Sequence, residues 1–267
     1  MRNILTIARK ELSIYFTTPW GWIGGAAMAF ISSFFFVFFL NSFKEVQDKA
    51  KVKGWANMDP DLAPMRNLTD GVIVNLFGWL LFITLFIAPF LAMRLFAEER
   101  RQKTIELLFT APVRTIEIVL GKYLGGVGAI SATLGVTIVY PVILSIFGAS
   151  QSGSALEWST VALGYGALFL WGAVCMGVGM FISALTESQM LAAVLTFVVL
   201  LLWTALGALA PSAEEPWRSA IRYVSFDTQL QNLMVGVLDV KALVFFVSII
   251  LLTVLFTHRA VEAQRWT

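Results

Sequence analysis

The densest group of charged residues in this sequence lies in one short stretch at 94–106. Its members are Arg94, Glu98, Glu99, Arg100, Arg101, Lys103 and Glu106. Glu99 precedes Lys103 by four residues, the order that favours an ion pair on a helix. Apolar residues at 105–109 form a second face, and Pro112 ends the segment. The pattern predicts an amphipathic helix at about 98–110 that docks on another protein. A solvated helix touching lipid headgroups is the alternative.

Residues that could bind a metal, form a disulfide or bind a nucleotide are few in this chain. A single cysteine, Cys175, excludes an internal disulfide and a cysteine-based metal cluster, and a single histidine, His258, excludes a multi-histidine site. No G-x-x-x-x-G-K-[ST] motif occurs, so the chain does not bind ATP through a P-loop. We therefore expect no catalytic residue, no metal and no cofactor within the chain, and any energy for work must come from a partner.

The composition shows which environment these residues occupy. Of the 267 residues, 58% are hydrophobic and 13% are charged, about half the charged share of soluble domains. A soluble chain of this length has too little interior to bury so much apolar surface. The sequence thus predicts an all-α integral membrane protein. The net charge of +2 gives no indication of nucleic-acid binding.

Six apolar segments are long enough, or nearly so, to cross a bilayer. They lie at 19–41, 72–93, 123–147, 159–183, 189–210 and 242–257. The sixth is short, so we expect Lys241 and Arg259 to extend their charges past its two ends. As delimited here the spans contain no Asp, Glu, Lys, Arg or His. This argues against ion-coupled transport and against an intramembrane enzyme.

The spans also contain features that affect helix packing. Pro89 and Pro141 should bend the second and third spans. Small residues recur at helical spacing, as in Gly121/Gly125 and Gly128/Ala132. This spacing permits close helix contact, either within the bundle or across a dimer face.

Six spans place both termini on one side of the membrane. Eleven of the nineteen Lys and Arg residues fall on that side, which favours cytoplasmic termini. Residues 2–16 predict an amphipathic helix in the interface, with Ile4, Leu5, Ala8, Leu12, Tyr15 and Phe16 on its apolar face. Thr18 and Pro19 then fit the cap and the first turn of span one.

Two longer segments fall on the opposite side. Residues 44–53 are polar and predict a helical extension of span one, followed by a turn at Asp59-Pro60-Asp61. The loop 42–71 either receives an outside partner or is simply solvated. In 211–241, apolar residues at helical spacing predict one or two short helices in or dipping into the outer leaflet. We expect this segment to form an outer gate or a re-entrant segment, with Trp217, Leu230, Leu233, Met234 and Val237 as its residues.

Four runs of the sequence carry a family resemblance. They are ARKELSIYFTTPWGWI (8–23), EERRQKTIELLFTAPVRTIEIVLGKYLG (98–125), ISALTESQMLAAVLTF (182–197) and GVLDVKALVFFVSIILLTVLFTHRAVEAQRW (236–266). Together they resemble, in order, the ABC-2 type permeases, the membrane subunits of certain ABC transporters. The most similar branch is that of bacterial gliding motility, with the nitrous-oxide-reductase maturation permease nearby. Two positions depart from the family pattern: Lys103 replaces a usual Gly, and Ser188 a frequent Asn.

The resemblance implies a single transmembrane domain over 1–267, re-entrant helices before the last span, and a coupling helix in a groove on an ABC ATPase. The implied ATPase contacts are Glu98, Glu99, Arg100, Arg101, Thr104, Glu106, Thr186 and Glu187. Reversing the charges of Glu98 and Glu99 is then expected to weaken ATPase binding without unfolding the membrane part. ATP and Mg²⁺ would bind the partner ATPase, and a second permease subunit, identical or related, would complete the complex.

We therefore expect a permease subunit in the bacterial cytoplasmic membrane that couples ATP hydrolysis by a partner to movement of a hydrophobic, amphipathic or polymeric substrate. Membrane lipid and a periplasmic accessory protein are further expected partners. The alternative is a scaffold that passes ATP-driven motion to such a periplasmic protein without transport.

Overall fold

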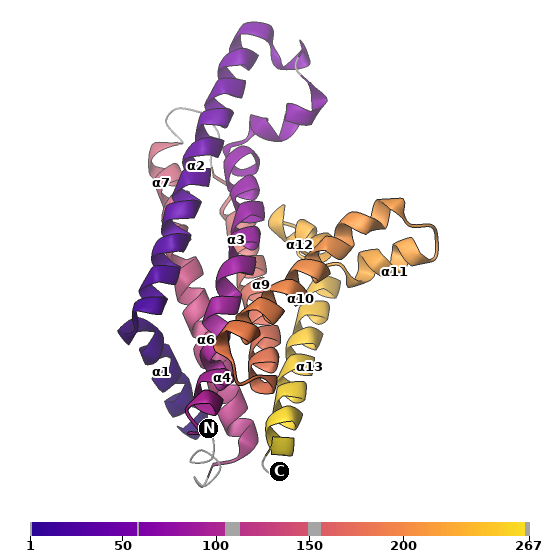
Figure 1. Ribbon diagram of the computed structural model, residues 1–267. Coiled ribbons are helices and arrows are strands. Elements are labelled where there is room, and N and C mark those ends of the chain that lie inside the picture. The colour runs from indigo at the N-terminus through magenta and orange to yellow at the C-terminus, as the bar shows by residue number, and fades with distance from the viewer. Residues whose placement is uncertain (1, 58, 105–112, 149–155, 265–267) are drawn as a thin grey trace.

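The computed structural model describes residues 2–57, 59–104, 113–148 and 156–264. This part of the chain is helical and contains no strand. Six helical segments are long and apolar enough to cross a membrane. They form an upright bundle with both chain ends at the same end, called here the termini end (Figure 1). The prediction of an all-α membrane protein is confirmed.

The first helices form a bent pair joined at Thr18. Helix α1 (Arg2–Thr17) is followed by α2 (Pro19–Lys53), with Pro19 in its first turn. The predicted polar extension is confirmed, since α2 continues through residues 44–53 and projects beyond the other spans (Figure 1). Short helical turns follow at η1 (Trp55–Asn57) and η2 (Pro60–Arg66), and the Asp59 carboxylate caps η2 through the N–H of Asp61 at 3.1 Å.

The second and third spans are each interrupted near a proline. The second comprises the π-helical turn η3 (Thr69–Val74), α3 (Asn75–Ala92) and α4 (Arg94–Arg101), with Pro89 in the last turn of α3. The third comprises α6 (Thr115–Gly135), η4 (Val136–Ile138) and α7 (Val139–Phe147). Pro141 has no N–H to donate to the carbonyl of Thr137, and the 3-10 turn η4 lies at that point.

The remaining spans are α9 (Trp158–Leu185), α10 (Gln189–Leu209) with the turn η5 (Ala210–Ser212), and α13 (Val240–Gln264). Between the last two lie α11 (Trp217–Val224) and α12 (Phe226–Met234). The last helix extends beyond the predicted sixth span of 242–257 at both ends. Helix α13 has 25 residues because its backbone hydrogen bonds continue past Arg259 into the polar C-terminal turn.

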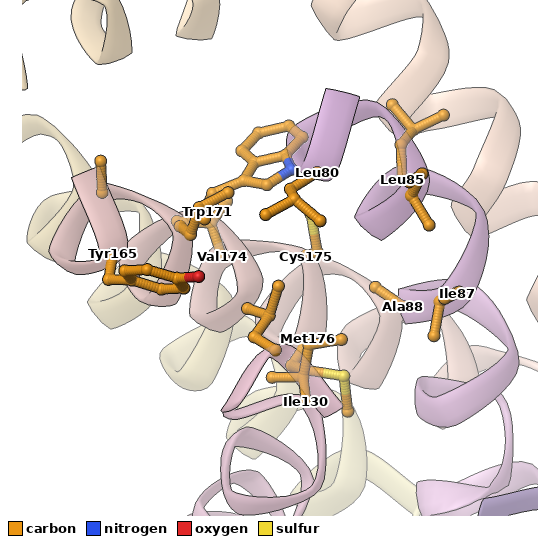
Figure 2. Close-up of a cluster of buried hydrophobic side chains, with 14 of the residues drawn as sticks. Leu80, Leu85, Ile87, Ala88, Ile130, Tyr165, Trp171, Val174, Cys175 and Met176 are labelled. Atoms are coloured by element: carbon orange, nitrogen blue, oxygen red, sulfur yellow. The ribbon is translucent and has the colours of Figure 1, made fainter. Parts of the chain in front are cut away.

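Helix α9 is the centre of the bundle, in contact with α3, α6, α10, α12 and α13. Figure 2 shows Trp171, Val174, Cys175 and Met176 of α9 among apolar side chains of α3 and Ile130 of α6. Cys175 is fully buried there. A helix surrounded by other helices needs no polar face, and α9 is apolar all round.

Candidate functional site

The candidate site lies at the termini end, where α1, α4, α6 and the end of α9 meet. Its position depends on Gly121 and Gly125, called here the glycine stripe of α6, because α1 packs directly on this helix. A Cβ atom added at Gly121 would lie 2.7 Å from Cβ of Ile7, and one at Gly125 would lie 2.5 Å from Cβ of Glu11. The predicted small-residue spacing thus serves contact within the chain at these positions.

The protein covers most of the apolar face predicted for α1, since Tyr15 is buried and Ile4, Ala8 and Leu12 are half-buried. Glu11 and Tyr15 are buried, whereas Leu5 and Phe16 of the predicted apolar face are 67% and 49% exposed. Thr18 does not act as the predicted side-chain cap of α2. Its hydroxyl instead donates to the carbonyl of Ile14 at 2.8 Å and accepts from Nη1 of Arg94 at 3.2 Å.

Lys122 is the central charge of the site. It lies inside α6, because this helix begins at Thr115 and not at the predicted position 123, and its side chain is 2% exposed. Its ammonium group lies 3.0 Å from a carboxylate oxygen of Glu11 and 2.7 Å from one of Glu99. A buried ammonium ion is stable only when it is paired. Lys122 therefore connects α6 to both α1 and α4.

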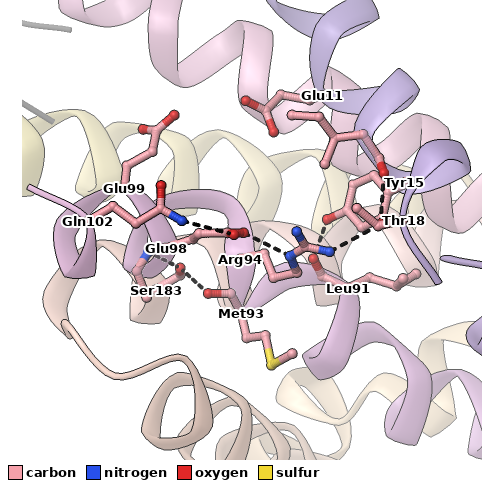
Figure 3. Close-up of polar contacts among 12 residues, drawn as sticks. Glu11, Tyr15, Thr18, Leu91, Met93, Arg94, Glu98, Glu99, Gln102 and Ser183 are labelled. Carbon is pink, nitrogen blue, oxygen red and sulfur yellow. Dashed lines mark hydrogen bonds and ion pairs between the residues drawn. The ribbon is translucent and has the colours of Figure 1, made fainter. Parts of the chain in front are cut away.

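A second group of polar contacts holds the junction between α3 and α4. Nε of Arg94 lies 2.8 Å from the Glu98 carboxylate, which also accepts from the Gln102 amide (Figure 3). The Tyr15 hydroxyl donates to the carbonyl of Leu91. Burial raises the pKa of Tyr15, so this hydroxyl remains a donor at neutral pH. These contacts attach α1 to the second span.

Ser183 joins α9 to the start of α4. Its hydroxyl is fully buried, donates to the carbonyl of Met93 at 2.9 Å, and accepts from the N–H groups of Phe96 at 3.1 Å and Ala97 at 3.0 Å (Figure 3). The first N–H groups of a helix lack partners within that helix. A side chain of a different span thus supplies a cap for α4.

Helix α4 ends earlier than predicted. We expected one continuous helix at about 98–110. In the described part of this range α4 ends at Arg101, and Lys103 has a φ of 56°, which is left-handed backbone; residues 105–110 lie outside the described residues. Glycine is the residue that adopts this conformation without strain, and glycine is usual here in the permeases that the sequence resembles. Thr104 is tied back to Glu99, with its N–H 2.9 Å from the Glu99 carbonyl. Glu106 lies outside the described residues.

The end of α4 lies beside the turn after α9. Nη1 of Arg100 donates to the carbonyl of Ala184 at 2.9 Å, and its Nη2 lies 3.5 Å from the Glu187 carboxylate. Thr186 is half-buried, while Arg101 is exposed and the Glu187 side chain is 75% exposed. Both parts of the predicted contact zone therefore reach one surface, where Glu98 and Glu99 are partly exposed and pair with cations of this chain.

Comparison with known families identifies the chain. The family described as ABC-2 family transporter protein matches residues 5–262. The chain belongs to this family. No curated protein gave a match. As a multi-pass ABC-2 protein with six apolar helices, it is a membrane permease subunit of the ABC transporter class, and the family implies association with an ABC ATPase.

The segment 211–241 of this ABC-2 protein contains the two predicted short helices, α11 and α12. Leu230, Leu233 and Met234 are buried where α12 packs on α9, whereas Trp217 is 71% and Val237 56% exposed. The ring of Phe226 lies against Trp171 of α9, with ring centroids 4.7 Å apart. The residues predicted for an outer gate thus divide into three that anchor α12 and two that face outward.

The sequence analysis did not assign a role to Glu11, Lys122 or Ser183 of the ABC-2 protein. Lys122 directly precedes the predicted third span, and Ser183 is the last residue of the predicted fourth span. The signal available for Glu11 was an acidic residue near the packed face of an otherwise basic amphipathic helix. Such a residue requires a cation from another element.

Proposed function

We propose that this chain is the permease subunit of an ATP-driven ABC-2 complex, in which a separate ATPase subunit binds ATP and Mg²⁺ and hydrolyses ATP. The observation that carries the proposal is the attachment of α4. Lys122 joins α4 to α1 and α6 through Glu99, and Ser183 and Arg100 join it to α9. A force applied to the end of α4 is therefore transmitted to three other helices.

The exposed side chains of the docking surface are Arg101 and Glu187, on α4 and on the turn after α9. We propose that they contact the ATPase, and that Arg100 and Thr186 support this surface from below. Glu98 and Glu99 act indirectly, by holding α4 in position. Reversing their charges would break ion pairs within the chain, so we expect such a variant to lose stability as well as ATPase binding.

A double charge reversal tests the docking surface. Arg101→Glu with Glu187→Lys should weaken binding of the co-expressed ATPase at least tenfold, about 1.4 kcal/mol. The matched control is Asp48→Lys with Lys51→Glu, which exchanges the charges of an exposed pair on the α2 extension. Affinity is measured on purified protein that elutes as a single peak. Wild-type affinity of an intact Arg101/Glu187 variant would refute the docking assignment.

We further propose that the complex lies in a bacterial cytoplasmic membrane with its termini inside, contains a second permease chain, identical or related, and moves a hydrophobic, amphipathic or polymeric substrate. This topology places the docking surface in the cytoplasm, where ATP is available. The apolar spans favour such a substrate over a hydrated ion.

One observation favours the alternative, a mechanical scaffold. Helix α2 is unbroken over 35 residues, from the junction with α1 to the polar extension at Lys53. At 1.5 Å per residue it is about 52 Å long, so motion of α1 would reach a periplasmic protein bound to the extension. A spin label at position 49 should then move on ATP addition in vesicles that show no ATP-dependent flux. Flux without movement of the label would favour the permease.

A further inference from the structure

Two pockets lie on either side of Tyr15, and they differ in polarity. The first, called here the charged pocket, has a volume of about 440 Å³, and its charged lining consists of Lys10, Glu11, Arg94, Glu98, Glu99 and Lys122. The second, the apolar groove, has about 320 Å³ and is lined by small and apolar residues of α2, α3 and α6 together with Tyr15 and Phe16. Each volume lies within the range of ligand sites, about 300–1,000 Å³.

The two pockets follow one another along the same helices. Tyr15 lines both of them. Leu91 lines the apolar groove and Arg94 lines the charged pocket, one helical turn further along the second span. A ligand that fills both must have a charged end and an apolar end. In a membrane protein, the abundant molecule of this form is a phospholipid.

We propose that the two pockets bind one aminophospholipid with a primary ammonium group, its headgroup in the charged pocket and an acyl chain in the apolar groove. The site needs no ATP and no substrate, so it stands apart from the proposed function. The bound lipid would contact α1, α2, α3 and α6 together and thereby hold α1 in place.

The polar contacts of the charged pocket favour a headgroup with both charges. Oε2 of Glu99 is buried and has no hydrogen-bond partner among the described residues. The Glu99 side chain is 17% exposed and lines the charged pocket, so rotation of its carboxylate group would let an ammonium group with N–H donors satisfy this oxygen. Lys10 is 58% exposed, and its Nζ lies 3.6 Å from Glu11 and 3.8 Å from Glu99, longer than hydrogen bonds. Its ammonium group can therefore also bind the lipid phosphate.

The apolar groove has open space at Gly25. A Cβ atom added there meets no atom within 4 Å, whereas one added at Gly21, a turn earlier, would collide with the backbone of Tyr15. A side chain at position 25 would therefore start in open space beside the groove, and we expect a leucine there to extend into it. It would occupy the space that we assign to the acyl chain.

The test compares three dioleoyl lipids with the purified full chain in detergent. Phosphatidylethanolamine has a primary ammonium group, phosphatidylcholine has an ammonium group without N–H donors, and phosphatidylglycerol has no cation. The readouts are the rise in melting temperature on lipid addition and the retained lipid counted by native mass spectrometry. We expect phosphatidylethanolamine to give a rise at least twice that of either other lipid, with one molecule retained.

Two variants address the two ends of the lipid. Lys10→Met and Gly25→Leu should each reduce the phosphatidylethanolamine effect by at least half, relative to the same variant without lipid. The matched controls are Lys49→Met, a lysine that is 57% exposed, and Gly166→Leu, where an added Cβ also meets open space. These controls should keep the full effect.

Three outcomes would overturn the proposal. Equal effects of phosphatidylethanolamine and phosphatidylcholine would show that Glu99 does not select an N–H donor. Equal losses in Gly25→Leu and Gly166→Leu would show that the groove is not the acyl site. Absence of any lipid effect would show that the pockets hold no tightly bound lipid. Each result is independent of ATPase binding and would leave the proposed function unchanged.

Discussion

The buried ammonium group of Lys122 shows how single residues determine the termini end. Two carboxylates from different helices surround it, and the ring of Phe96 lies 5.2 Å from its nitrogen. Removing one partner from such a cluster leaves a buried charge that is desolvated and has no ion pair to offset the cost. This makes the cluster a stronger constraint than any ion pair on the surface of the α2 extension.

Lys122→Met is expected to destabilise the protein by about 3–5 kcal/mol, because Glu11 and Glu99 lose their buried partner. Thermal unfolding in detergent, followed by tryptophan fluorescence, measures this loss. Lys51→Met is the control, since the Lys51 side chain is 74% exposed and its pair with Asp48 should contribute little. Adding Glu11→Gln and Glu99→Gln to Lys122→Met should restore part of the stability. Equal melting temperatures for the two single variants would contradict the role of Lys122.

Lys103 gives a second prediction at this scale. Its left-handed backbone disfavours a β-carbon by about 1–2 kcal/mol. Lys103→Gly should therefore raise the melting temperature or leave it unchanged, whereas Lys103→Val should lower it. Substitution of Gln102, whose φ is −83°, by Gly and Val is the control. A higher melting temperature for Lys103→Val than for Lys103→Gly would mean that position 103 does not adopt this turn.

At the scale of helices, close approach depends on where glycine faces a neighbour. Gly164 and Gly166 lie two residues apart in α9 and face different surroundings. An added Cβ at Gly164 would collide with the ring of Phe77, and at Gly166 it meets open space. Tight packing of α9 on α3 therefore requires glycine at position 164 but not at position 166.

Gly164→Ala should destabilise the protein by about 1–3 kcal/mol through overpacking. Gly166→Ala should stabilise it by roughly 0.5–1 kcal/mol, since alanine is the better helix former and gains no clash. Urea or thermal unfolding of the two variants side by side measures the difference. If Gly166→Ala proves the more harmful of the two, the described packing of α9 against α3 is wrong.

At the scale of the whole molecule, the bundle has two different ends. The termini end carries the charged cluster and the proposed docking surface. The opposite end carries the projecting α2 extension, and α11 and α12 lie on the side of the bundle (Figure 1).

The proposed topology predicts how introduced cysteines react. With Cys175 replaced, cysteines at positions 48 and 215 should react with an impermeant maleimide in intact cells, and a cysteine at 102 only after permeabilisation. All three native side chains are exposed, so reactivity reports the side of the membrane and not burial. Reaction at 102 in intact cells would reverse the orientation.

The sequence alone determined the class of protein, the six spans, the α2 extension, the amphipathic first helix and the two short helices before α13. These follow from local composition and periodicity. A long run of apolar residues is more stable in the bilayer than in water, and a helix satisfies its backbone hydrogen bonds there. The predicted charges at 94–101 were also located correctly as a dense polar element at the termini end.

Only the tertiary structure decided how those charges are used. Lys122 pairs with Glu11, 111 residues away, because the glycines of α6 allow α1 to pack closely on this helix. Ser183 caps α4 because the central helix α9 lies beside it. A pattern along the chain gives the face of a helix but not its neighbour. Pairing of buried charges depends on that neighbour, so the ion pair between Glu99 and Lys122 could not be predicted from the sequence.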